Sequence, residues 1–78
     1  MLKVTTGNNM KRTTVFVDEN TTLKECLEAN EVDYTRGTVH LDSAPLGPGD
    51  LNKTFASLGY DGTPGHDKCY LLNVVKAD

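Results

Sequence analysis

Two histidines, each close to an aspartate, are the residues of this chain with the chemistry to bind a metal. His40 precedes Asp42 by two positions, and His66 is followed directly by Asp67. Imidazole nitrogens and carboxylate oxygens are typical ligands of zinc and related divalent metals. The spacing within each pair is generic, and nothing in the sequence brings the pairs together. The simpler interpretation is one solvated strand histidine and one loop histidine, so we expect no metal site and no cofactor.

The hydroxyl and thiol groups form no recognisable catalytic arrangement. Ser43 and Ser57 have no evident base with an orienting carboxylate, and no Gly-x-Ser-x-Gly motif occurs. Cys26 and Cys69 form no Cys-x-x-Cys pair, and periodicity places each at a position expected to be buried, which indicates inert core thiols. Whether they approach each other stays open. Gly-Pro-Gly-Asp at 47–50 lacks the Gly-Lys-Ser/Thr of a phosphate-binding loop and indicates a turn. We expect no enzyme activity.

Acidic residues follow one face of an expected helix. Glu25, Glu28 and Glu31 are spaced three residues apart, and Asp33 follows closely. This pattern is typical of a solvated helix surface. An acidic docking surface is the alternative, and its like charges would cost roughly 0.2–0.5 kcal/mol per pair.

The bulk properties indicate one small domain covering residues 1–78. The net charge is −3, and Lys11-Arg12 is the only basic pair, which argues against a nucleic-acid partner. No run approaches the roughly 20 apolar residues of a membrane span. The start, Met1-Leu2-Lys3-Val4, is typical of a strand rather than a signal peptide. We therefore expect a cytoplasmic protein without a membrane partner.

The first part of the chain predicts a β-hairpin followed by a helix. Residues 2–6 alternate apolar and polar, Gly7-Asn8-Asn9 favours a turn, and residues 12–17 are rich in β-branched side chains. Thr13, Val15 and Val17 share one face of the second strand. Thr22 and Glu25 match a capping box. The stripe of the helix comprises Leu23, Cys26, Leu27 and Asn30, which predicts about three turns ending at 30–32.

The second part predicts two short strands, a brief helix and a long final strand. Val39 and Leu41 should face inward on a strand at 38–41, with His40 outward, and Leu46 should anchor a short edge strand. Asp50 can cap a helix over 51–58, which Gly59 would end. The segment 69–75 is the most apolar, so we expect it at the centre of the sheet.

The side of the sheet opposite the helix is the predicted binding site. Tyr70, Leu72 and Val74 are expected to point inward, so that alternate residues of the last strand point outward. An apolar patch on this side would mark a contact with a protein partner. The predicted protein-binding residues are Phe16, His40, Leu71, Asn73 and Val75.

The order of these elements resembles the β-grasp fold of ubiquitin and its relatives over nearly the whole chain. The matching segments are Met1-Leu2-Lys3-Val4, Val15-Phe16-Val17 before the Thr-capped helix, Val39-His40-Leu41, Leu46 with residues 54–60, and Tyr70-Leu71-Leu72-Asn73-Val74. The resemblance implies an α+β domain with a mixed four- to five-stranded sheet packed on one main helix. It also implies that the first and last strands pair in parallel at the centre of the sheet.

The C-terminal residues depart from the family pattern. Ubiquitin-like modifiers and sulfur carriers end in Gly-Gly, because their C-terminal carboxylate is activated through an enzyme channel. This chain ends Val74-Val75-Lys76-Ala77-Asp78, so the expected function is a non-catalytic ubiquitin-like protein-interaction module. The alternatives are a small accessory subunit of a multi-component enzyme such as an oxygenase, and, less favoured, a modifier with an atypical tail. A homodimer is a further alternative.

Overall fold

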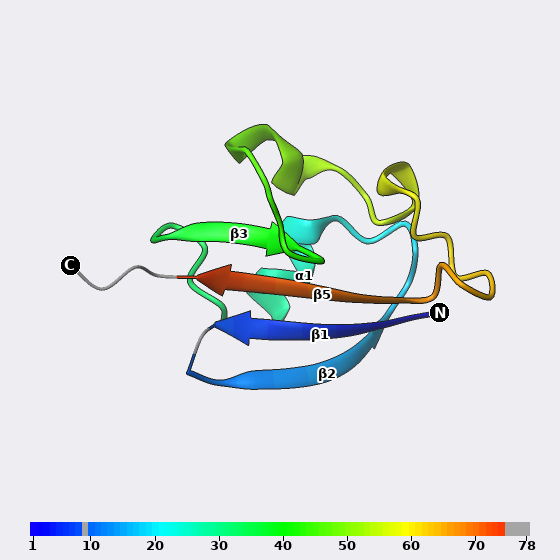
Figure 1. Cartoon of the computed structure of the whole chain (residues 1–78), viewed down its shortest axis with the longest axis horizontal. Helices are drawn as coiled ribbons and strands as arrows, with labels where there is room; N and C mark the ends of the chain where they lie inside the picture. Colours follow the sequence, from blue (N-terminus) through cyan, green and yellow to red (C-terminus); the bar gives the residue numbers. More distant parts are fainter. Residues whose placement is uncertain (9, 75–78) are drawn as a thin grey trace.

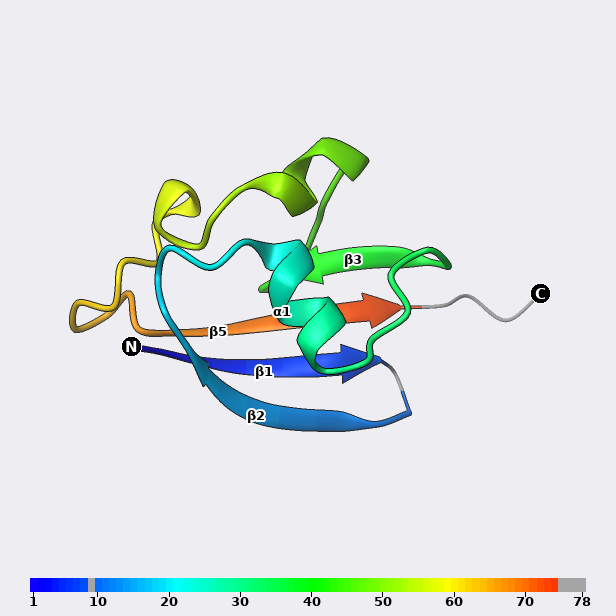
Figure 2. The same ribbon diagram turned by 180° about the vertical axis from the view of Figure 1, so that it is seen from behind.

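Within the part of the chain that the structure describes, five strands form one mixed sheet, with a single α-helix across one of its faces (Figures 1 and 2). The structure, a computed structural model, describes residues 1–8 and 10–74. The order of strands across the sheet is β2-β1-β5-β3-β4. Their bounds are β1 Leu2–Asn8, β2 Arg12–Val17, β3 Thr38–Leu41, β4 Ala44–Pro45 and β5 Lys68–Val74. The helix α1 spans Leu23–Ala29. No helix among the described residues is long and apolar enough to cross a membrane.

The first and last strands lie side by side and parallel, as predicted. Val4 pairs with Cys69 and Thr6 with Leu71, while β2 and β3 flank this pair in antiparallel orientation. The central position of β5 is therefore confirmed. A parallel pair needs a crossover connection, which usually carries a helix, and α1 lies within this one (Figure 2).

The β1–β2 turn depends on a glycine. Gly7 has a φ of 145°, and a Cβ atom at this position would lie 2.1 Å from the Lys11 carbonyl oxygen. The side chain of Asn8 then accepts hydrogen bonds from the backbone N–H groups of Met10 and Lys11, each at 2.8 Å. The chain reverses here because glycine permits the close approach and asparagine satisfies the turn amides.

The helix begins where the sequence predicts and is shorter than expected. Thr22 Oγ1 accepts a hydrogen bond from the Glu25 backbone N–H at 3.1 Å, as an N-cap should. Helix α1 has seven residues, about two turns instead of three. It ends because Glu31 adopts a φ of 58° and the Val32 N–H returns to the Leu27 carbonyl at 2.9 Å.

The predicted helix at 51–58 is wrong. The segment contains two short 3₁₀ turns, η1 (Pro48–Asn52) and η2 (Ala56–Leu58), with an extended connection between them. That connection pairs with residues around the start of α1: Leu23 N–H donates to the Lys53 carbonyl, and Phe55 N–H donates to the Thr21 carbonyl. These bonds, and the complete burial of Phe55, outweigh the helical pattern. Gly59 does end η2, with a φ of 99°.

The core lies between α1 and the sheet. Its buried hydrophobic residues are Leu2, Val4, Leu23, Cys26, Leu27, Val32, Val39, Leu41, Phe55, Cys69 and Leu71. This list confirms Leu23, Cys26 and Leu27 of the predicted stripe and the inward residues of β3. Asn30, the fourth predicted member, is half-buried and lies just after α1. Both cysteines are free and buried.

The predicted alternation of β5 is wrong by one residue. Leu71 and Asn73 were expected to face outward, and they are 0% and 1% exposed. Tyr70 is exposed, and Leu72 and Val74 are half-buried on the opposite side. The Nδ2 of Asn73 donates to the Asp33 carbonyl at 2.7 Å, while its buried Oδ1 has no partner among the described residues.

Candidate protein-binding face

The side of the sheet opposite α1, called the open face below, is covered by no helix (Figure 1). Strand pairing arranges its side chains in rows across the sheet. Phe16, Lys3 and Lys68 form one row. Thr14, Thr5 and Tyr70 form the next. The third row contains Arg12, Gly7, Leu72, His40 and Pro45, and the fourth contains Val74 and Thr38.

Two aromatic side chains stand exposed on this face. Phe16 is 66% and Tyr70 is 55% exposed, and they come from β2 and β5, with β1 between them. The half-buried Leu72 and Val74 extend the apolar surface along β5. Large aromatic residues and Arg are enriched at protein–protein interfaces, and an apolar patch of this kind on a small domain often marks an interaction site.

A hollow of about 440 Å³ opens in the third row. Its lining residues are Arg12, His40, Ser43, Tyr70, Leu72 and Val74. Gly7 lies between Arg12 and Leu72 in the strand pairing and carries no side chain. The side chain of Arg12 therefore borders the same hollow as Leu72. Its lining combines the half-buried aliphatic side chains of Leu72 and Val74 with a guanidinium and an imidazole.

A second hollow of about 410 Å³ adjoins the first on the same face. It is lined by Lys3, Thr5, Thr14, Lys68, Cys69 and Tyr70. Tyr70 contributes to both hollows and separates them. The second hollow is the more polar of the two, and the hydroxyl groups of Thr5 and Thr14 lie 3.3 Å apart within it.

The open face is positively charged although the chain is acidic. Lys3, Arg12 and Lys68 lie on it, and the carboxylate beside its rows is that of Asp42, which follows β3 next to Tyr70. The whole chain has a net charge of −3. On the other side of the sheet, α1 exposes two acidic residues, Glu25 and Glu28, and one cation, Lys24. The open face therefore carries more cations than anions, whereas α1 carries more anions than cations.

A carboxylate at the edge of the open face fixes its central strand. Asp42 follows β3 and has a φ of 50°. Its Oδ1 accepts a hydrogen bond from the Tyr70 backbone N–H at 2.8 Å, and its Oδ2 accepts one from the Tyr60 hydroxyl. Burial, together with this hydrogen bond to Asp42, raises the pKa of Tyr60 to about 12. Both oxygens of Asp42 therefore have structural partners.

The predicted site residues divide into three groups. Phe16 and His40 lie on the open face, as predicted. Leu71 and Asn73 lie in the interior, so their placement on this face was wrong. Val75 lies outside the described residues. The face instead presents residues that were not selected from the sequence: Arg12, Lys68, Tyr70, Leu72 and Val74.

One signal in the sequence could have corrected the error. Cys69 was expected to be buried, and it is 3% exposed. Side chains alternate along a strand with a period of two, so Leu71 and Asn73 must share the side of Cys69. Leu72 and Val74 are apolar, and the prediction therefore placed them inward in spite of this alternation.

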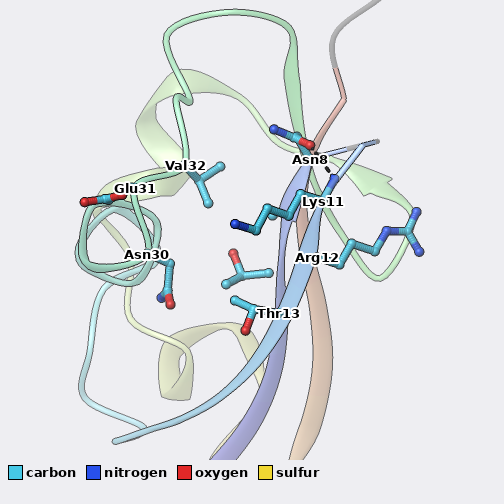
Figure 3. Close-up of a pocket in the computed structure, with 9 residues that line it drawn as sticks. Asn8, Lys11, Arg12, Thr13, Asn30, Glu31 and Val32 are labelled. Carbon is cyan, nitrogen blue, oxygen red and sulfur yellow. Dashed lines mark hydrogen bonds between the residues drawn. The ribbon is translucent and has the colours of Figure 1, made fainter.

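A smaller cleft of about 140 Å³ lies between the hairpin and the C-terminal end of α1 (Figure 3). Lys11 extends into the space between hairpin and helix, whereas Arg12 and Glu31 point away from it (Figure 3). The buried Thr6 Oγ1 lines the cleft and has no partner among the described residues. Carbonyl oxygens at a helix C-terminus disfavour an anion, and Lys11 disfavours a cation. The cleft therefore defines no class of ligand.

Two kinds of group considered for chemistry can be described within residues 1–8 and 10–74: metal-ligating side chains and thiols. No cluster of three or more metal-ligating side chains occurs in that part of the chain. Burial raises the pKa of the Cys26 thiol to about 11 and that of the Cys69 thiol to about 12. Both thiols are therefore protonated near neutral pH and are weak nucleophiles.

Comparisons of the chain with protein-family models, with curated proteins and with solved structures find no match.

Proposed function

We propose that this protein is a non-catalytic, ubiquitin-like interaction module of the β-grasp type, and that it binds a protein partner through its open face. The fold assignment is supported by the strand order, by the parallel pairing of β1 and β5, and by the helix that crosses one side of the sheet. These are the features that the resemblance to ubiquitin implies.

One observation carries the proposed function: Tyr70 and Phe16 are both exposed on the open face, and Tyr70 lines the hollow that also contains Leu72 and Val74. Burying exposed apolar surface stabilises a complex by about 25 cal/mol per Å² before the costs of association. The surrounding strands fix the positions of these side chains, so binding requires little ordering of the backbone.

The test is a quantitative pull-down from a lysate of the native host with three forms of the protein. Tyr70→Ser and Phe16→Ser each remove an exposed aromatic group from the open face. Met10→Ser is the matched control, because Met10 is 91% exposed in the β1–β2 turn and lies outside the rows of the open face. We expect specific proteins to be recovered with the wild type and Met10→Ser and lost with both face variants. Recovery that is equal for all forms would contradict the proposed function.

The pull-down also separates the proposed function from the accessory-subunit alternative. A binding module is expected to recover partners without a shared catalytic activity. An accessory subunit would recover the large catalytic chains of one enzyme in constant proportion. Nothing in the described residues favours the accessory-subunit alternative.

A further inference from the structure

Charge on the open face distinguishes among the partners that could occupy it. Lys3, Arg12 and Lys68 stand on this face. The carboxylate at its edge, that of Asp42, already accepts hydrogen bonds from the Tyr70 N–H and the Tyr60 hydroxyl. The one ion pair found among the described residues, Lys53 with Asp50 at 2.9 Å, lies elsewhere. These cations are therefore available to a partner's anionic groups, whereas the acidic surface of α1 would repel the same partner.

We propose that the occupant of the open face is an acidic peptide segment with an aliphatic side chain, an inference that rests on the proposed function. The aliphatic side chain would enter the hollow over Leu72 and Val74. A neighbouring carboxylate would bind Arg12 at the rim of that hollow. Carboxylates further along the segment would meet Lys3 and Lys68 in the second hollow, beyond Tyr70.

The chemistry of each contact matches this ligand. The guanidinium of Arg12 can bind a carboxylate with two parallel hydrogen bonds, which adds specificity to attraction. His40 Nδ1 lies 3.2 Å from the Thr38 carbonyl oxygen, which leaves Nε2 available at the rim. The aromatic ring of Tyr70 offers contact area on both of its sides, since it borders both hollows.

Single-stranded nucleic acid is the rival polyanion, because exposed aromatic rings and cations also bind stacked bases. Two observations favour the peptide. The first is the arrangement of the side chains: the exposed rings of Phe16 and Tyr70 belong to strands separated by β1, and the hollow beside Tyr70 is lined by the aliphatic Leu72 and Val74. The net charge of −3 opposes a ligand that carries one phosphate per nucleotide more strongly than it opposes a short acidic peptide.

The experiment is selection from a phage-displayed library of random linear peptides on the immobilised full chain. Enriched peptides are then synthesised and titrated against four forms: wild type, Tyr70→Ser, Arg12→Gln and Lys24→Gln. Lys24 is an exposed cation on α1 and is the matched control for the loss of one charge. We expect the enriched peptides to combine Asp or Glu with a nearby Leu, Ile, Val or Met. Arg12→Gln should weaken their binding about tenfold, and Lys24→Gln should leave it unchanged.

Each other outcome overturns a defined part of the reasoning. Peptides that depend on Tyr70 but show no excess of acidic residues, or that ignore Arg12→Gln, would overturn the acidic partner and leave the binding face intact. Enrichment of no peptide that depends on Tyr70 would overturn the face itself. A fluorescent oligothymidine that competes with the peptides and binds more tightly would assign the face to nucleic acid. A dimer in sedimentation experiments that Tyr70→Ser dissociates would assign it to a second copy of this chain.

Discussion

The backbone N–H of Tyr70 donates a hydrogen bond to the Asp42 carboxylate at 2.8 Å, although 28 positions separate the two residues in the sequence. The second oxygen of Asp42 accepts from the Tyr60 hydroxyl. One carboxylate thus connects the end of β3, the start of β5 and the segment after η2. The position of Tyr70 on the open face depends on this connection.

We expect Asp42→Ala to lower the free energy of unfolding by about 1–3 kcal/mol, because two donors lose their acceptor. Asp42→Asn is the matched control. It keeps an oxygen for the Tyr70 N–H, and asparagine tolerates the φ of 50° at this position. Urea unfolding should therefore show a smaller loss for Asp42→Asn. Equal stability of Asp42→Ala and wild type would contradict the role assigned to the carboxylate.

The raised pKa values of two side chains predict that the protein loses stability at alkaline pH. The pKa of Tyr60 is raised to about 12 from 10.0, and that of Cys69 to about 12 from 9.0, in both cases mainly by burial. The unfolded chain releases these protons at the ordinary pKa values, so stability is full below about pH 9 and falls as the pH rises toward 12. Urea midpoints measured from about pH 8 to about pH 11 test this. Cys69→Ala should reduce the fall of the urea midpoint with pH. A wild-type midpoint that stays unchanged across this pH range would contradict the prediction.

The observed alternation of side chains along β5 predicts that two adjacent leucines contribute unequally to stability. Leu71 is fully buried against α1's side of the sheet, whereas Leu72 is half-buried on the open face. Leu71→Ala should cost about 2–5 kcal/mol of stability through a cavity in the core. Leu72→Ala should cost less than about 1.5 kcal/mol, because much of its side chain already contacts solvent. Thermal unfolding measures the loss of stability in both variants. A larger loss for Leu72→Ala than for Leu71→Ala would mean that the side chains of β5 alternate in the opposite sense.

Local patterns in the sequence were sufficient to predict most of the fold. Alternation in residues 2–6 and 12–17 predicted the hairpin, Thr22 marked the start of α1, and Val39 and Leu41 were placed inward. These predictions succeeded because each depends on neighbours within a few positions.

The parts that could not be predicted depend on contacts between distant segments. Asn73 donates a hydrogen bond to the Asp33 carbonyl, 40 positions away, which no local pattern reveals. Phe55 is drawn into the core by pairing with the segment before α1, and this prevents the helix expected there. The open face was predicted as a surface, and its residues on β5 were assigned wrongly although the expected burial of Cys69, with the period of two along a strand, places Leu71 and Asn73 inside.

Gly7 is the glycine on which the hairpin most depends. Gly7→Ala should destabilise the protein by more than about 2 kcal/mol, because the new Cβ would lie 2.1 Å from a backbone oxygen at a φ of 145°. Gly49→Ala is the matched control, since nothing lies within 4 Å of its added Cβ. Circular dichroism melts should separate the two variants clearly. Equal melting temperatures would mean that the β1–β2 turn adopts another conformation.

Site-specific photo-cross-linking in the native host tests the open face most directly. A benzophenone amino acid is placed at Tyr70, at Phe16 and, as a control on the helix side, at Lys24. We expect discrete adducts with other proteins from positions 70 and 16 and none from position 24. Adducts from position 24 alone, or none from any position while the protein stays folded, would contradict a partner bound on the open face.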